Sequence, residues 1–115
     1  MIVLFSEDLM MTSTVSAAAR AAGQTFRSVR SNEKLVERLD NEAVEHVLID
    51  LQTAAIDFDL IEKLCHGRTD GTPRMTGYAQ HVNVDAIHRG REIGLDEVLT
   101  RGQLHGNVNT ILARE

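Results

Sequence analysis

Apolar and polar residues are grouped in blocks along the chain, and five of these blocks have the pattern of β-strands. The run Ile2–Phe5 is continuously apolar, which is typical of a strand buried on both faces of a parallel sheet. Gln24–Val29 is more polar and is expected near a sheet edge. The other predicted strands are His46–Asp50, Arg74–Ala79 and Glu97–Thr100. Thr76 and Gly77 weaken the strand pattern of Arg74–Ala79.

Each predicted strand is followed by a helix-like pattern with an apolar stripe. Asp8–Ala22 is the first of these, and Gly23 stands where a helix C-cap is expected. Ser31 or Asn32 is expected to cap the second helix. Val84, Ile87 and Arg91 are expected to share one face of the fourth helix, and Gly94 is expected to end this helix. The predicted inward residues are, for the first helix, Met11, Val15, Ala18 and Ala22; for the second, Leu35, Val36 and Leu39; for the third, Ile56, Leu60 and Leu64; for the fourth, also Ala86 and Ile93; and for the last, Leu104, Val108, Ile111 and Leu112.

Five strand–helix units in this order predict one α/β domain over residues 1–115, with helices on both faces of a parallel sheet. Because crossovers are right-handed, few topologies remain, and we expect the flavodoxin-like doubly wound (βα)5 sandwich of strand order 2-1-3-4-5. In that topology ligands gather at the carboxyl ends of strands 1 and 3. Ser6-Glu7-Asp8 and Asp50 stand at those two ends.

Charge and composition exclude several classes of function. The 115 residues carry a net charge of −5 with Lys and Arg dispersed, which is unsuited to nucleic acid or to an anionic membrane surface. No signal-peptide pattern begins the chain, and no segment approaches the roughly 20 apolar residues of a membrane span. The single cysteine, Cys65, suits a reducing compartment. We therefore expect a cytoplasmic protein, with Cys65 as an inert, partly buried filler.

The acidic residues predicted to share one crevice, Glu7, Asp8 and Asp50, require a neutralising partner. Two unit charges about 4 Å apart repel by roughly 1 kcal/mol in water and by about 4 kcal/mol at an effective dielectric near 20. A magnesium ion, a basic side chain or a raised carboxyl pKa relieves such repulsion. Simpler roles are also open: Asp50 capping the next loop, and Glu7 and Asp8 placing charge at a helix start.

Four segments resemble the receiver domain of bacterial two-component response regulators, and the resemblance covers nearly the whole chain. They are the apolar strand with following acids (Ile2–Asp8), the helix end Ala21–Gly23, the strand around Asp50 (Val47–Leu51), and Gly94–Arg101. The resemblance implies that Asp50 is the phosphoacceptor position. It also implies that Glu7, Asp8 and Asp50 are Mg²⁺ ligands, and that a sensor kinase or an output protein is the partner.

The chain departs from the family pattern at most of the switch positions. Ser6-Glu7 stands where receivers usually carry two adjacent acids, and Tyr78 replaces a small hydroxyl residue, although Ala79 after it matches. Arg101 replaces the family lysine, with Gly102 in place of proline. Arginine and lysine are not interchangeable at a close-contact site. The sequence leaves open whether Arg101 pairs with Asp50, which would lower the pKa of Asp50 and displace the metal. Tyr78 is expected to cover the pocket.

These departures predict a stand-alone, degenerate receiver-like domain that is not an enzyme, has no cofactor and acts by protein–protein contact. The face formed by Val84–Glu115 is the expected partner or homodimer surface. The alternative is an active phosphoacceptor that uses Asp50 with Mg²⁺. A second alternative is a small enzyme or cofactor binder in the same crevice, using His81 or His105. A flavin site at Thr12–Thr14 is disfavoured because the segment lacks glycine and the chain has few aromatic residues.

Overall fold

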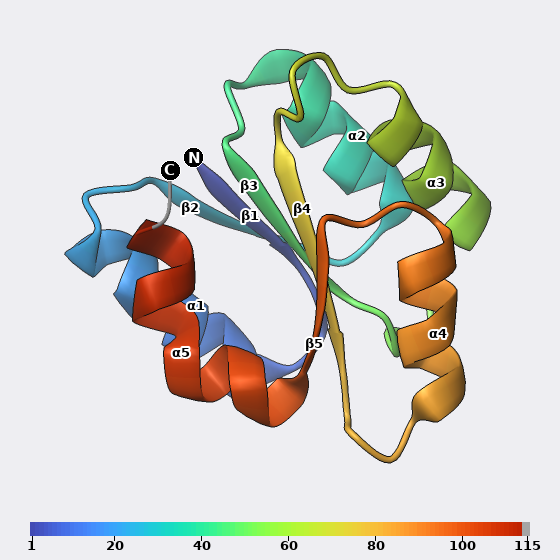
Figure 1. Cartoon of the computed structure of the whole chain (residues 1–115). Helices are drawn as coiled ribbons and strands as arrows, with labels where there is room; N and C mark the ends of the chain where they lie inside the picture. Colours follow the sequence, from blue (N-terminus) through green and yellow to red (C-terminus); the bar gives the residue numbers. More distant parts are fainter. Residues whose placement is uncertain (114–115) are drawn as a thin grey trace.

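The computed structural model describes residues 1–113 and contains a parallel sheet between two layers of helices (Figure 1). Its strands are β1 (Ile2–Phe5), β2 (Phe26–Val29), β3 (His46–Asp50), β4 (Arg74–Ala79) and β5 (Glu97–Thr100). Their order is β2-β1-β3-β4-β5, and every neighbouring pair is parallel. The predicted fold class and strand order are confirmed. The polar strand β2 lies at a sheet edge as predicted, although it begins two residues later than Gln24.

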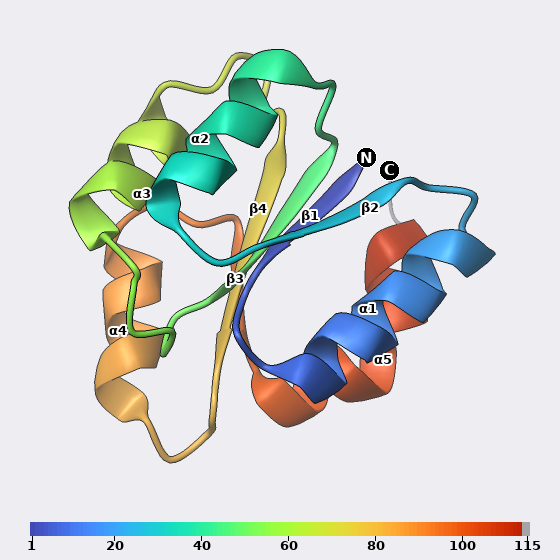
Figure 2. The same cartoon turned by 180° about the vertical axis from the view of Figure 1, so that it is seen from behind.

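The helices are α1 (Leu9–Ala21), α2 (Asn32–Asn41), α3 (Phe58–His66), α4 (Val84–Glu92) and α5 (Arg101–Ala113). α1 and α5 cover one face of the sheet, and α2, α3 and α4 cover the other (Figures 1 and 2). The side chains of Asp8, Ser31, Asp57 and Asn83 accept hydrogen bonds from the first turns of α1 to α4, which fixes where these helices begin. Among residues 1–113, no helix combines the length and apolar character that a membrane crossing requires.

Alternate residues of the strands belong to two separate cores, because successive side chains of a strand point to opposite faces. Val3 and Phe5 pack under α2, α3 and α4, whereas Ile2 and Leu4 pack under α1 and α5. Cys65 is buried in the first of these cores, and burial raises the pKa of its thiol. Cys65 therefore fills space as predicted, but it is more completely buried than expected.

Three helical stripes differ in detail from the predicted ones. Ala22 is exposed and Ala19 is buried instead, because α1 ends at Ala21. Ile56 precedes α3, whose first turn is capped by Asp57, so that Ile61 and Cys65 are the fully buried positions. Val84 and Arg91 are exposed, whereas α4 buries Ala86 and Gly90.

Glycine explains why α4 turns this face toward the sheet. A Cβ atom on Gly90 would lie 2.7 Å from Cδ1 of Leu51, and one on Gly77 of β4 would lie 2.6 Å from Cδ1 of Leu95. Contacts this short do not occur between real side chains. The two glycines therefore provide the space into which Leu51 and Leu95 pack between the sheet and α4.

Candidate functional site

The residues predicted to share one site lie at the carboxyl ends of β1, β3 and β4, with the start of α5 beside them. Ser6 directly follows β1, and Asp50 is the last residue of β3. Tyr78 is the register partner of Asp50 on β4. Arg101 is the first residue of α5, immediately after β5. Parallel pairing thus brings residues that are far apart in sequence to one edge of the sheet.

The Ser6 hydroxyl is the centre of the site, with its side chain almost fully buried (1% exposed). Ser6 Oγ donates to Asp50 Oδ2 at 3.0 Å and lies 2.8 Å from the Tyr78 hydroxyl oxygen. It also accepts the backbone N–H of Asp8 at 3.0 Å. A serine hydroxyl has one proton to give. Because that proton is directed to Asp50, Tyr78 is the donor to Ser6, and the hydrogen bonds run in one direction from Tyr78 through Ser6 to Asp50.

Both carboxylate oxygens of Asp50 accept hydrogen bonds from the protein. Oδ2 accepts from Ser6, and Oδ1 accepts the backbone N–H of Gln52 at 2.9 Å. The second of these bonds is a local turn of the kind that aspartate commonly forms after a strand. The loop-capping role that the sequence left open for Asp50 is therefore present, and the side chain stays partly exposed.

Arg101 forms an ion pair with Asp8. Its Nε donates to Asp8 Oδ2 at 2.8 Å, while Asp8 Oδ1 accepts the backbone N–H of Met11 and caps α1. The hydrogen bond from Arg101 holds the pKa of Asp8 below its ordinary value. Among the ion pairs within residues 1–113, none joins Arg101 to Asp50, so the question that the sequence left open is answered by Asp8 instead. The packing of α1 against α5 explains the difference, because it sets the cap of one helix beside the first residue of the other.

Tyr78 lies inside the protein rather than over the crevice. Its side chain is 2% exposed and belongs to the core beneath α1 and α5, together with Leu4 and Leu104. Burial raises the pKa of the phenol, so the hydroxyl keeps its proton and donates at any ordinary pH. The prediction that Tyr78 covers the pocket is corrected accordingly: the ring fills the interior beside Ser6. Ala79 is buried in the core on the opposite face of the sheet.

The predicted metal ligands are not gathered around one point. Glu7 is exposed, and Asp8 is already shared between Met11 and Arg101. Within residues 1–113 no three His, Cys, Asp or Glu side chains form a group able to hold a metal ion. The side chains present therefore do not fit a magnesium ion in this arrangement, because the position beside Asp50 holds a hydroxyl and the nearby cation is a guanidinium.

The sequence also offered two histidines as residues of an enzyme or cofactor site at this edge of the sheet. His81 follows β4 and His105 lies on α5, and both are exposed. The hydroxyl of Thr53, in the loop after Asp50, is the one buried side-chain polar atom in the described residues without a hydrogen-bond partner. Sequence reasoning aligned Ser6 with a family acid but did not identify it as the centre of the site. The available signal was a small hydroxyl residue at the end of a buried strand.

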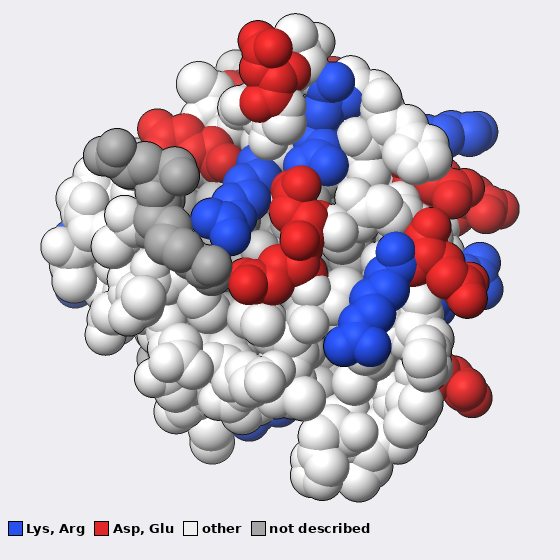
Figure 3. Space-filling model, viewed as in Figure 1, with Lys and Arg blue, Asp and Glu red and all other residues white. Residues whose placement is uncertain are grey.

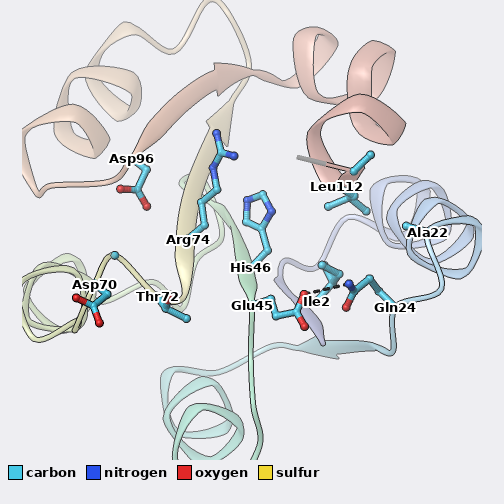
Figure 4. Close-up of a pocket in the computed structure, with 12 residues that line it drawn as sticks. Ile2, Ala22, Gln24, Glu45, His46, Asp70, Thr72, Arg74, Asp96 and Leu112 are labelled. Carbon is cyan, nitrogen blue, oxygen red and sulfur yellow. Dashed lines mark hydrogen bonds between the residues drawn. The ribbon is translucent and has the colours of Figure 1, made fainter. Parts of the chain in front are cut away.

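A separate cavity of about 810 Å³ lies at the opposite end of the sheet (Figure 4). Its described lining includes His46 and Arg74 from adjacent strands, with Glu45 and Asp96 close by. His46 Nε2 lies 2.8 Å from the Thr76 hydroxyl, and Asp96 is paired with Arg68. These pairings are structural, and the cavity is remote from Asp50.

The Asp8–Arg101 ion pair predicts how the stability of the protein depends on pH. Because the folded pKa of Asp8 lies below its ordinary value of 3.8, the ion pair stabilises the fold above that value and is lost as pH falls through the folded pKa. Asp8→Asn should keep the cap of α1 and lose the charge, at a cost of about 1 kcal/mol at neutral pH. Urea unfolding along a pH series is expected to show the two proteins converging on acidification. A difference that is independent of pH would contradict the ion pair.

Similarity to known proteins is found in the structure of the chain and not in its sequence. No protein-family model matches the chain, and no curated protein matches it in sequence. The receiver domain of TorR, the response regulator of the TMAO respiratory system, is similar with a TM-score of 0.80 and 19% identity, over 96% of this chain and 94% of that chain. The chemotaxis response regulator CheY4 of Vibrio cholerae has a TM-score of 0.78 and 9% identity, over 96% of this chain and 93% of that chain.

A third solved structure is the receiver domain of a sensor histidine kinase from Pseudomonas aeruginosa, with a magnesium ion coordinated in its active-site cleft. It is similar with a TM-score of 0.77 and 13% identity, over 96% of this chain and 92% of that chain. At these identities the likeness establishes the fold, which is that of CheY-like receiver domains.

Proposed function

We propose that the chain is a receiver-like signalling domain that acts by protein–protein contact and does not pass through an ordinary cycle of aspartyl phosphorylation. The observation that carries the proposal is the pairing of Arg101 with Asp8 at 2.8 Å. A carboxylate expected to hold a metal and the cation expected to meet a phosphoryl group neutralise each other.

The electrostatics of phosphoryl transfer support this proposal. Catalysis of that transfer depends on positioned cations that stabilise the charge on the transferred oxygens. In this site the Asp50 oxygens accept hydrogen bonds from Ser6 and Gln52, and the nearby guanidinium is occupied by Asp8. A phosphoryl group on Asp50 would therefore meet a cation whose charge Asp8 already neutralises in part.

A protein partner follows from this role, and we propose a sensor kinase or an output protein. The face predicted for it, Val84–Glu115, corresponds to α4, β5 and α5, and its last two residues lie outside the described part of the chain. We also propose a cytoplasmic location and a non-enzymatic role, because a signalling domain of this kind acts by binding other proteins. The chain has one cysteine, which is buried, so it has no internal disulfide framework of the kind common in oxidising compartments.

The alternative proposal is an active phosphoacceptor, and one observation favours it. Asp50 is partly exposed at the carboxyl end of β3, in a fold shared with a response regulator from Burkholderia pseudomallei that was solved with a phosphorylated aspartic acid. In this reading Asp50 is the nucleophile and Glu7 and Asp8 turn toward Mg²⁺. No described contact favours an enzyme or cofactor site built on His81 or His105.

Intact mass measurement after incubation with acetyl phosphate and Mg²⁺ tests the proposal, with Asp50→Asn as the control. The expected result is no phosphoryl adduct on a protein shown to be folded by circular dichroism. An adduct on the native chain that is missing from Asp50→Asn would establish the active phosphoacceptor instead.

A further inference from the structure

One edge of the sheet has a charge opposite to that of the rest of the chain. The stretch Leu9–Asn32, which includes α1 and β2, contains Arg20, Arg27 and Arg30 and no Lys, Asp or Glu. It carries a charge of +3, so the remaining residues carry −8 within a net charge of −5. All three arginines are exposed, and we call them the edge arginines.

The edge arginines have no acidic partner within the described part of the chain. None of them takes part in an ion pair among residues 1–113. On the face shown in Figure 3, by contrast, blue and red side chains lie mostly next to one another. The arginines that do form ion pairs are Arg38, Arg68, Arg74 and Arg101. The positive charge at the edge is therefore available to a partner outside the chain.

The backbone of β2 is open on one side. Its neighbour in the sheet is β1, and Figure 2 shows β2 at the outside of the sheet. The carbonyl oxygens of Thr25 and Val29 accept hydrogen bonds from the N–H groups of β1 and of the residue that follows it. Because these groups alternate in direction along a strand, the N–H and C=O groups of Phe26 and Ser28 point away from β1. An open edge of this kind is a template for an added strand.

Guanidinium groups flank this open edge on both sides. Phe26 packs against the core beneath α1 and α5, whereas Val29 belongs to the core on the other face of the sheet. Arg27 alternates with Phe26 and so lies on the side of Val29. Its Nη1 donates to the outward carbonyl oxygen of Phe26 at 3.0 Å. On the side of α1, Arg20 lines a hollow of about 440 Å³ together with Phe26.

Charge decides which chain fits this edge. A second copy of the protein paired along β2 would bring its own arginines against these, and like charges facing each other across strands are destabilising. An extended acidic segment has the opposite charge. Because successive side chains of a strand point to opposite faces, one of its carboxylates meets Arg27 and the next meets Arg20.

We propose that β2 binds an extended acidic segment of another protein, which adds to the sheet as a sixth strand. The segment forms backbone hydrogen bonds with Phe26 and Ser28 and ion pairs with Arg20 and Arg27, and Arg27 releases the carbonyl of Phe26 to it. β2 and β5 are the two opposite edges of the sheet. This surface is therefore separate from the α4–β5–α5 face proposed above, and its use does not depend on phosphorylation of Asp50.

Fluorescence anisotropy with a labelled peptide of alternating Glu and Val residues tests the charge part of the proposal. Arg20→Gln and Arg27→Gln are each expected to raise the peptide Kd about threefold or more. Arg91→Gln is the matched control, because it removes the same charge at an exposed position of α4. We expect the control to leave the Kd unchanged, and added salt to weaken binding to the native chain.

Ser28→Pro tests the backbone part, because proline removes an outward N–H group without removing a bond to β1. The variant is expected to raise the Kd about tenfold, and a thermal melt verifies that it folds. Hydrogen exchange on the native chain gives a second measurement that needs no variant. Adding the peptide should slow exchange of the Phe26 and Ser28 amides and leave those of Arg27 and Val29 unchanged.

Four outcomes would overturn the proposal. The native chain could fail to bind the Glu–Val peptide. A peptide of alternating Glu and Pro, which cannot form a strand ladder, could bind as tightly, and binding would then be by charge alone. A single-stranded oligonucleotide that binds more tightly than the peptide would assign the edge arginines to nucleic acid. Self-association that is lost in Ser28→Pro would make a second copy of the chain the occupant of the edge.

Discussion

Tyr78→Ala is expected to lower the free energy of unfolding by about 3–5 kcal/mol, because it removes a fully buried aromatic ring and leaves a cavity. The ring is 2% exposed and packs in the core beneath α1 and α5. Urea unfolding followed by circular dichroism measures the change. The variant should unfold at much lower urea concentration than the native chain.

Tyr78→Phe is the matched control for this prediction, since it keeps the ring and removes only the hydroxyl. Ser6 would still donate to Asp50 and accept the N–H of Asp8, so no buried donor is left without a partner. We expect a cost of about 0.5–1.5 kcal/mol. Equal costs for the two variants would mean that the hydrogen bond, and not the packing of the ring, holds Tyr78 in place.

Ser6→Asp is expected to destabilise the protein strongly when divalent metal is removed by EDTA, and to make its stability depend on Mg²⁺. The new carboxylate would lie at a site that is 1% exposed, beside Asp50. Two carboxylates about 4 Å apart repel by about 4 kcal/mol at an effective dielectric near 20. A cation bound between them would restore about 2.7 kcal/mol at a concentration near 100 times its Kd.

Ser6→Asn separates charge from shape in this experiment, because it has nearly the same size as aspartate and no charge. Thermal melts of both variants and of the native chain, each with EDTA and with Mg²⁺, provide the comparison. Only Ser6→Asp should respond to Mg²⁺. A native chain that is equally stabilised by Mg²⁺ would contradict the view that Arg101 has taken the place of a metal in this site.

Strands could be predicted from the sequence more accurately than helical faces, for a physical reason. A strand buried on both sides of a parallel sheet is a nearly continuous apolar run, and Ile2–Phe5 and His46–Asp50 were predicted to the residue. The buried side of α4 is determined instead by Gly90, whose missing side chain leaves no hydrophobic signal. An apolar residue such as Val84 was therefore assigned inward although it is 53% exposed.

The candidate site was predicted in position but not in its pairings. Strand order alone placed Ser6, Asp8 and Asp50 at one edge of the sheet, and the structure has them there. The partner of Arg101 depends on how α5 begins directly after β5 and packs beside α1, which local sequence does not determine. The role of Ser6 depends on the phenol of Tyr78, which reaches it across 72 residues of chain.

The interlocking of Leu51 and Leu95 with Gly77 and Gly90 has a consequence for sequence variation. The Cδ1 atom of Leu51 approaches the Cβ position of Gly90 to 2.7 Å, and that of Leu95 approaches the Cβ position of Gly77 to 2.6 Å. Extra volume in such packing forces neighbouring side chains to shift, at a cost of about 1–3 kcal/mol. A side chain at position 77 or 90 is therefore best accommodated when the residue at position 51 or 95 moves or becomes smaller, so the residues tolerated at these four positions depend on one another.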